Sequence, residues 1–238
     1  TWSMAILQIG GIIAVPDIPL IFFTALFFWL YRLFLQKLSL SNALLLGLGM
    51  TLMLYSKYHG ILIILFTLAS NLKLLKQPLA YVAAFFGIVL FIPHLQWQYV
   101  HHFPSVQYNL FERNSSGYKF SFTTDYLAGQ LLLAGPLMGW LLIWQSFRYK
   151  TMDAFEKALK FSLMGIYLFF LLATLKGRVE ANWTAPAIVP LIILSSQALQ
   201  RKEKWKIFLW RWMPVTLLLV FALRIYMAAD IKPFTWMP

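Results

Sequence analysis

Four polar segments of an otherwise apolar chain carry residues to which chemistry can be assigned. The first is Pro16-Asp17-Ile18-Pro19, in which Asp17 precedes a long apolar run. Aspartate is a preferred helix N-cap, and a carboxylate is stabilised at the positive end of the helix dipole. We therefore expect Asp17 to cap a helix, and the same carboxylate could also bind a cation, a sugar hydroxyl or a metal.

The second segment, Ser56-Lys57-Tyr58-His59-Gly60, places a lysine between two apolar runs with almost no loop. A charge at the centre of a bilayer costs about 2.5–3.5 kcal/mol, so Lys57 must reach the interface or face a polar cavity. Two interpretations remain open. The side chain extends to the membrane surface, as long cationic side chains commonly do, or its ammonium contacts a phosphate.

The third segment is a long polar stretch that contains His101, His102, Glu112 and Arg113, with His94 shortly before it. Histidine and carboxylate side chains can bind metal ions. The spacing here is unspecific, however, and the adjacent His101 and His102 point in different directions in regular structure, so no metal site is assigned. Arg113 is the stronger candidate, because guanidinium is a good bidentate partner for phosphate.

The fourth segment runs from Lys176 to Pro186 and combines two cations, Lys176 and Arg178, with the acid Glu180. Loops on the outer side of a membrane usually avoid Lys and Arg. Two cations in one such turn therefore indicate an anion to be bound, and a charged loop without a ligand is the alternative. Together, the four segments predict carboxylates beside cations, as a lipid-linked phosphate substrate would require.

Composition determines the class of protein that must position these residues. The 238 residues are 61% hydrophobic and 12% charged, with a mean hydropathy of +0.70 and no cysteine. Soluble proteins average about 45–50% apolar and about 25% charged residues. These values exclude collagen-like, disordered and disulfide-rich chains and any thiolate chemistry. They leave an integral membrane protein, and we predict an all-α bundle.

About 20 apolar residues in a helix cross a hydrocarbon core, and on this basis we predict seven or eight spans in one transmembrane domain covering residues 1–238. A leading apolar piece covers residues 3–15. The outer loop is 97–125, of which 97–112 could form an interfacial helix. The chain opens at Thr1, so we expect an N-terminal portion to precede it. The predicted spans are 18–35, 42–56, 60–72, 79–96, 126–147, 159–175, 184–199 and 207–228.

The charges predict the orientation of these spans. If the turn at Pro16 faces outside and the spans alternate, thirteen of the 20 Lys and Arg residues fall on the inner side. This is the positive-inside distribution of membrane proteins. It accounts for most of the net charge of +12, so nucleic acid is not a predicted partner. Function is therefore expected on the outer face, where most of the acids and the long loop lie.

The four segments, in this order, resemble the bacterial branch of the GT-C glycosyltransferases, related to protein O-mannosyltransferases and lipid A aminoarabinose transferases. Besides the Pro16 turn, the resemblance rests on three segments: Leu54 to Gly60, Pro93 to Arg113, and Glu180 to Pro186. It implies a bacterial inner-membrane enzyme whose active site faces the periplasm. It also implies a polyprenyl-phosphate-linked sugar donor and a protein or lipid acceptor.

In that family a carboxylate in the first outer loop is the presumed general base, and this chain begins after that loop. This chain is thus expected to be the C-terminal part of a larger enzyme and to lack the main catalytic acid. Asp17 matches a second acidic position and Lys57 a basic one. In the implied mechanism a carboxylate takes the proton of the acceptor hydroxyl, and Asp17 and Glu180 are the candidate catalytic carboxylates. Lys57, Arg113, Lys176 and Arg178 are the candidates for binding the phosphate. A divalent metal ion could assist but is not required.

Two alternatives remain beside the transferase. A transporter or flippase for an anionic or lipid-linked substrate could use similar residues, although such proteins usually show internal repeats and polar residues near mid-span. Here the predicted spans are nearly pure Leu, Ile, Phe and Ala, with Gln130 a rare polar exception. A non-catalytic membrane scaffold is the other alternative, and it leaves the outer cations without a role.

Overall fold

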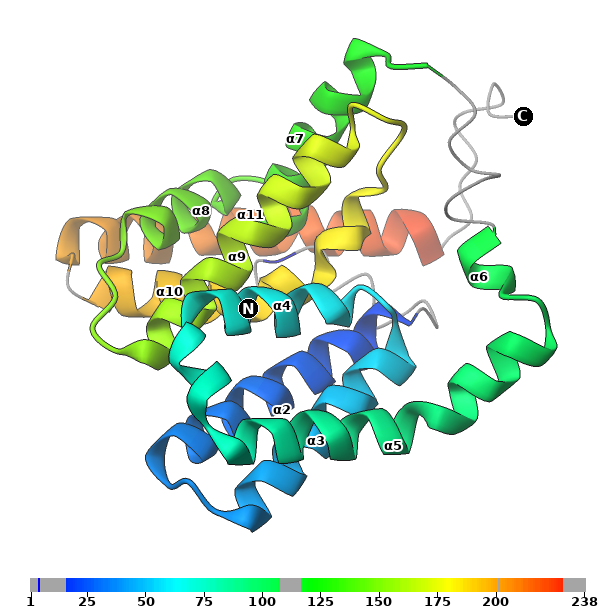
Figure 1. Cartoon of the computed structure of the whole chain (residues 1–238). Coiled ribbons are helices and arrows are strands. Elements are labelled where there is room, and N and C mark those ends of the chain that lie inside the picture. Colours follow the sequence, from blue (N-terminus) through cyan, green and yellow to red (C-terminus); the bar gives the residue numbers. More distant parts are fainter. Residues whose placement is uncertain (1–3, 5–15, 108–116, 201, 229–238) are drawn as a thin grey trace.

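The computed structural model describes residues 4, 16–107, 117–200 and 202–228, and within these ranges it contains helices and no strand (Figure 1). The all-α prediction is confirmed to that extent. In chain order the elements are α2 (Asp17–Gln36), α3 (Leu40–Ser56), α4 (Gly60–Ser70), the 3-10 helix η1 (Leu72–Lys76), α5 (Pro78–Val100), α6 (Pro104–Gln107), α7 (Phe120–Ala134), α8 (Gly139–Arg148), α9 (Ala154–Ala173), the 3-10 helix η3 (Ala181–Ala187), α10 (Ile188–Gln200) and α11 (Glu203–Ala228).

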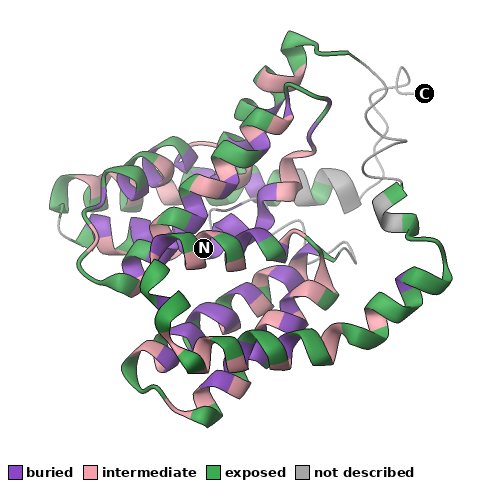
Figure 2. Ribbon diagram, viewed as in Figure 1, coloured by how far each residue is buried: buried purple, intermediate pink, exposed green. Residues whose placement is uncertain are grey.

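Helix α2 is the central element of the bundle. It packs along α3 and also contacts α4, α9, η3 and α10. Its buried face carries large side chains, among them Leu20, Phe27, Tyr31 and Phe34. Figure 2 shows buried residues gathered on α2 and on the helices beside it, while α5 is mostly exposed. Because α2 is central, the residues at its two ends lie among residues from several other helices.

Helices α3 and α5 approach each other closely through small residues. A Cβ atom built on Gly47 would lie 2.5 Å from the carbonyl oxygen of Ala83. The Thr51 hydroxyl lies 3.0 Å from the carbonyl oxygen of Gly47 in its own helix and 3.0 Å from that of Gly87 across the interface. Small residues are typical of helix contacts in membranes, where close backbone approach replaces the hydrophobic driving force.

Side-chain hydrogen bonds define where two of the helices begin. Ser39 caps α3 by accepting from the backbone N–H of Asn42, whose amide in turn donates to the Lys37 carbonyl at 2.8 Å. Asp153 caps α9 by accepting from the backbone N–H of Glu156 at 2.8 Å. Such caps satisfy backbone donors that a helix start leaves without partners.

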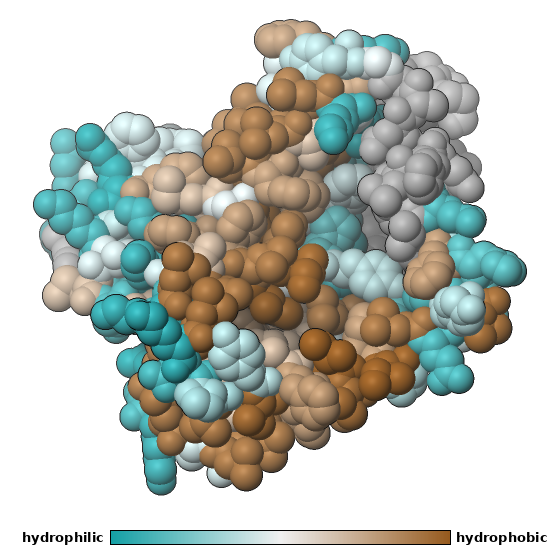
Figure 3. Space-filling model, viewed as in Figure 1, coloured by the Kyte–Doolittle hydropathy of each residue, from teal (hydrophilic) through white to brown (hydrophobic). Residues whose placement is uncertain are grey.

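The exterior of the bundle is apolar over large areas. Figure 3 shows a broad hydrophobic band across the middle of one face, with hydrophilic groups toward its edges. Helix α5 contributes exposed Phe85, Ile88 and Ile92, and Phe85 alone is 68% exposed. Exposed apolar surface of this extent marks contact with lipid or with another protein, and on helices this long and apolar we assign it to lipid.

Three of the described helices are long and apolar enough to cross a membrane, α2, α5 and the Glu203–Ala222 part of α11, and a bent pair raises the number to four. The predicted seven or eight spans are therefore not confirmed. Two causes are evident. Helices α3 and α4 have only 17 and 11 residues, whereas a span needs about 20. The predicted span 184–199 begins with 3-10 turns, because η3 extends to Ala187.

The predicted span 126–147 is not one straight helix in the structure. The chain forms α7 and α8, which are bent by 94° at residues 135–138. Gly135 adopts φ 136°, which residues with a side chain rarely adopt, and Pro136 follows it. Proline also disfavours helical backbone in the residue before it. The composition is apolar throughout this stretch, so the hydropathy pattern alone did not reveal the break.

We predict that Gly135→Ala lowers the free energy of unfolding by about 1–3 kcal/mol, the range for a non-glycine residue forced into such a backbone conformation. Thermal unfolding of the purified protein in detergent would measure the change. Gly117→Ala is the matched control, because a Cβ there meets nothing within 4 Å. Equal melting temperatures for the two variants would contradict the strain at Gly135.

The boundaries of the predicted outer loop also differ. Helix α5 continues through residue 100 despite Pro93 within it, and α7 begins at Phe120. Of the predicted interfacial helix 97–112, residues 97–100 belong to α5 and 104–107 form α6. Residues 108–116 lie outside the described residues, as does the predicted leading piece apart from Met4.

Candidate functional site

The candidate site is built on an ion pair between two of the residues predicted from the sequence. The Nζ atom of Lys57 lies 2.7 Å from Oδ1 of Asp17. The Asp17 side chain is only 5% exposed and that of Lys57 is 18% exposed. Of the two interpretations of Lys57, free extension of its side chain to the membrane surface is therefore not what the structure shows. Its ammonium has three N–H donors, and Asp17 takes one of them.

A third polar residue completes this cluster. The side-chain amide of Asn182 donates to Oδ2 of Asp17 at 2.7 Å. Both carboxylate oxygens thus accept a hydrogen bond, and a buried carboxylate needs such partners. Asp17 and Asn182 are 165 positions apart in the chain. The cluster of Asp17, Lys57 and Asn182, called here the Asp17 cluster, therefore joins three of the four polar segments.

Local structure explains how each member is positioned. Asp17 is the first residue of α2, Lys57 lies in the short break between α3 and α4, and Asn182 lies in the first turn of η3. The predicted N-cap role of Asp17 is wrong. Pro16 holds the N-cap position and makes no side-chain cap bond. Asp17 instead directs its carboxylate toward Lys57, while its charge stays at the favourable end of the helix dipole.

The turn that presents Asn182 is held by Gln130, the polar exception within the predicted spans. The Gln130 amide donates to the carbonyl oxygen of Ala181 at 3.2 Å, and the Thr184 hydroxyl donates to Gln130 Oε1 at 2.5 Å. Gln130 and Thr184 are both buried. Because these bonds bracket Asn182 on both sides in the chain, they fix the position of its side chain relative to α7.

A second polar group lies next to Lys57 in the sequence. The hydroxyl of Tyr58 contacts Nε2 of His94, and the Gln98 amide donates to the same hydroxyl at 2.5 Å. The His94 ring packs against Tyr55 and Phe91, with ring centroids 5.7 Å and 5.0 Å apart. This group ties the break after α3 to the last turns of α5.

The two histidines predicted as outer-loop candidates lie at the end of α5. His101 stacks on Trp97 with ring centroids 4.3 Å apart, and its Nδ1 lies 2.7 Å from the Trp97 carbonyl oxygen. His102 and Phe103 have positive φ angles of 59° and 55°, so the backbone leaves the helical conformation between α5 and α6. Among the residues that the structure describes, no group of three His, Cys, Asp or Glu could hold a metal ion.

The remaining predicted site residues either lie at the surface or fall outside the residues that the structure describes. Arg178 Nε lies 3.7 Å from Glu180 Oε1, with side chains 70% and 42% exposed. Lys176 is also exposed. An exposed pair of this kind contributes about 0–1 kcal/mol to stability, so it holds Arg178 only weakly. Glu112 and Arg113 lie outside the described residues.

The polar segments gather at one end of the bundle, called here the Asp17 end. Besides the Asp17 cluster, a hydrogen bond of 2.9 Å joins Thr123 in α7 to Thr174 at the end of α9. At the opposite end, residues 35, 70, 77 and 154 surround one pocket. The polar segments were predicted to share one side of the membrane. Their described residues lie at the same end of the bundle.

Asn182 lies within the fourth segment but is not among the site residues predicted from the sequence. It falls in an Asn-Trp-Thr triplet that also matches a glycosylation sequence, and such short matches carry little weight. A useful signal was available. Asn182 is the amide nearest to Glu180 in a turn between two apolar runs, where a polar side chain needs a partner.

A protein family and a curated protein are similar in sequence to this chain. Residues 3–97 match the family of dolichyl-phosphate-mannose-protein mannosyltransferases. This stretch contains Asp17 and Lys57. The chain is also 26% identical over 191 residues to the lipid A galacturonosyltransferase RgtD of Rhizobium johnstonii. That match covers 75% of this chain and 40% of the relative.

The two matches support the GT-C superfamily of membrane glycosyltransferases without identifying a member. The apolar helices and the family match together indicate an integral membrane protein. The chain spans only 40% of the length of the curated relative. No solved structure matches the chain.

Proposed function

We propose that this chain belongs to a membrane glycosyltransferase that moves a sugar from a polyprenyl-phosphate donor to a lipid or protein acceptor on the outer face of a bacterial inner membrane. The observation that carries the proposal is the Asp17 cluster. It places a lysine ammonium, held by a buried carboxylate, at one end of an apolar bundle. A donor of this kind needs its tail in the bilayer and its phosphate at such a point.

The contacts favour distinct roles for the two charged members. Both oxygens of Asp17 already accept hydrogen bonds, so its proposed role is to hold Lys57. The ammonium keeps two donors for phosphate oxygens, and a positioned cation stabilises the charge that develops on a leaving phosphate. Glu180, whose side chain is 42% exposed, is proposed to bind or deprotonate the acceptor hydroxyl.

The exposed cations near Glu180 suggest which chemical group of the sugar or acceptor this site could bind. The name of the curated relative refers to a galacturonosyl group, which carries a carboxylate. Lys176 and Arg178 are both exposed in the segment before η3. We propose that they contact an acidic group on the sugar or on the acceptor. The predicted Arg113 would add to this positive charge in the long outer loop.

Binding of the lipid phosphate tests the proposal. We expect the purified chain in detergent to bind undecaprenyl phosphate more tightly than undecaprenol by about 10–100-fold, because a hydrogen bond to a charged group contributes about 1.5–3 kcal/mol. Native mass spectrometry would measure both ligands. The double variant Asp17→Asn/Lys57→Met should lose the preference without leaving an unpaired buried charge.

Lys119→Met is the matched control, because it removes an exposed lysine at the first residue before α7. It should keep the preference for the phosphate. Equal binding of the two lipids by the wild-type chain would contradict the phosphate site. Equal loss in the control would mean that the effect is one of overall charge.

The bent pair α7–α8 favours a second candidate function, a transporter or flippase for a lipid-linked substrate. Broken helices often form substrate sites in transporters, and this pair is bent by 94°. The two functions differ in their products. Proteoliposomes loaded with a polyprenyl-phosphate sugar would show covalent transfer to lipid A in the first case and movement of the unchanged donor across the bilayer in the second.

A further inference from the structure

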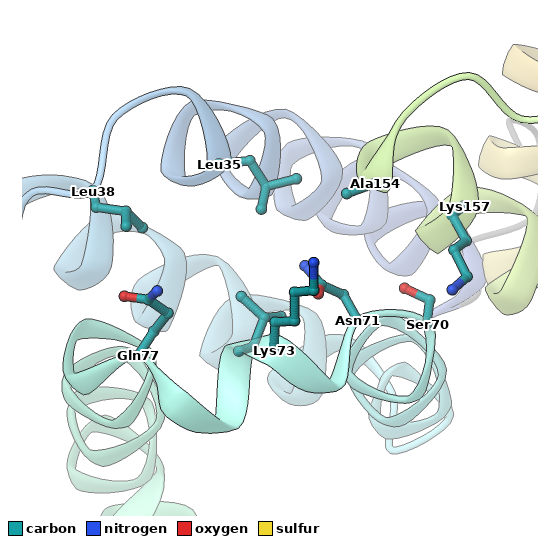
Figure 4. A pocket seen from close by; sticks show the side chains of 9 residues that line it. Leu35, Leu38, Ser70, Asn71, Lys73, Gln77, Ala154 and Lys157 are labelled. Carbon is teal, nitrogen blue, oxygen red and sulfur yellow. The ribbon is translucent and has the colours of Figure 1, made fainter.

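A pocket of about 350 Å³ lies at the end of the bundle opposite the Asp17 cluster (Figure 4). It is formed where the end of α2 meets η1 and the start of α9. Leu35 and Leu38 contribute from α2 and the turn after it, and Asn71, Lys73 and Gln77 from η1 and its flanking residues. Lys157 contributes from α9. Helix α2 has 20 residues, and at 1.5 Å per residue it separates the two places by about 30 Å.

The charged side chains that line this pocket are all positive. Two lysines line it, and none of the described residues that line it is acidic. Figure 4 shows the Lys73 side chain extending from η1 toward α2, and that of Lys157 extending from α9 toward Ser70. The two ammonium groups therefore approach the pocket from different elements. Both side chains are exposed, so a ligand can reach them.

The acids nearest in sequence are already occupied. Asp153 accepts from the backbone N–H of Glu156. Glu156 accepts from the Tyr149 hydroxyl at 3.0 Å and from the backbone N–H of Met152 at 2.6 Å. Neither Lys73 nor Lys157 forms an ion pair with an acid in the part of the chain that the structure describes. The positive charge of the pocket is thus not neutralised by these acids.

Exposed apolar side chains lie around the pocket. Leu38, Leu72 and Leu75 are exposed around it. The side chains of Asn71 and Gln77 also line the pocket, and each amide carries N–H donors. Two ammonium groups and two amides suit the oxygens of one phosphate group, and exposed leucines suit acyl chains beside it. Basic pockets between membrane helices bind anionic lipid headgroups in this way.

We propose that this pocket binds the phosphate group of an anionic ligand, carried by a phospholipid headgroup or by a soluble phosphate ester. The site is separate from the candidate active site and does not depend on the proposed transferase function. On the predicted orientation it faces the cytoplasmic side, where anionic lipids are plentiful. Lys73 and Lys157 supply the charge, and the amides select a ligand that accepts hydrogen bonds.

Native mass spectrometry with phosphatidylglycerol and phosphatidylcholine tests the proposal. We expect the wild-type chain to retain phosphatidylglycerol preferentially. The variant Lys73→Ala/Lys157→Ala should bind it about 100-fold more weakly, because each hydrogen bond lost between an ammonium and a phosphate group costs about tenfold. The control Lys76→Ala/Lys150→Ala removes two exposed lysines that do not line the pocket and should bind as the wild type does.

Glycerol 3-phosphate distinguishes the two sources of the phosphate. Binding of this ester without phosphatidylglycerol, again lost in Lys73→Ala/Lys157→Ala, would support the phosphate site with a soluble ligand. Equal retention of the two phospholipids with no binding of the ester would overturn the proposal. An equal loss in the control variant would also overturn it, because the effect would then come from general surface charge. Unchanged melting temperatures would show that both double variants remain folded.

Discussion

Replacing Lys57 with Met is expected to lower the free energy of unfolding by about 3 kcal/mol. Removing one partner of a buried ion pair leaves the other charge without compensation, which costs about 3–5 kcal/mol. We expect the lower end of this range, because the Lys57 side chain is 18% exposed and Asp17 keeps its bond to Asn182. Equilibrium unfolding in mixed detergent micelles would measure the change.

The double variant Asp17→Asn/Lys57→Met should recover most of this loss, because no unpaired charge then remains in the cluster. The wild type, the two single variants and the double variant form a double-mutant cycle, and such cycles isolate the pairwise energy of two residues in contact. Lys119→Met, an exposed residue, should change stability by less than about 0.5 kcal/mol. Additive effects in the cycle would show that Asp17 and Lys57 do not interact.

Replacing Gly47 with Leu is expected to lower the free energy of unfolding by about 3 kcal/mol, the upper end of the range for overpacked interiors. Even a Cβ atom at this position would lie 2.5 Å from the backbone of Ala83. The neighbour is backbone, so it cannot move aside as a flexible side chain would. Helices α3 and α5 would have to separate, and the Thr51 contact with the Gly87 carbonyl would be lost.

Ala84→Leu is the matched control for this prediction, because Ala84 is next to Ala83 in α5 but is exposed. It adds the same kind of side chain outside the interface and should leave the melting temperature nearly unchanged. Thermal unfolding in detergent would compare the two variants. A Gly47→Leu protein as stable as Ala84→Leu would show that α3 and α5 do not pack through Gly47.

Of the two residues in these predictions, the sequence pattern singles out Lys57 but not Gly47. Lys57 was selected because a lysine between apolar runs must find a polar environment. Gly47 is not among the residues predicted from the sequence, although Gly47-x-x-x-Thr51 and Ala83-x-x-x-Gly87 both have the small-residue spacing of close helix pairs. The spacing is common, and without the partner helix nothing in the sequence distinguishes a contact from an exposed position.

The sequence alone determined the class and the location of the polar segments. Apolar content and the low number of charges are properties of composition, and they predict a helical membrane protein independently of how the helices pack. The ends of α2, α3 and α5 were predicted within a few residues, because charged and proline residues mark them. The four polar segments follow from the same local pattern.

Only the tertiary structure decided which of these residues meet. Lys57 and Asp17 are 40 positions apart and Asn182 is 165 from Asp17, so their contact depends on how α2, α3 and η3 pack. The 94° bend between α7 and α8 arises from the backbone at Gly135, which hydropathy does not record. The basic pocket likewise exists because α2, η1 and α9 end together. Packing brings distant residues together, and a single sequence specifies that packing only through the whole set of helix contacts.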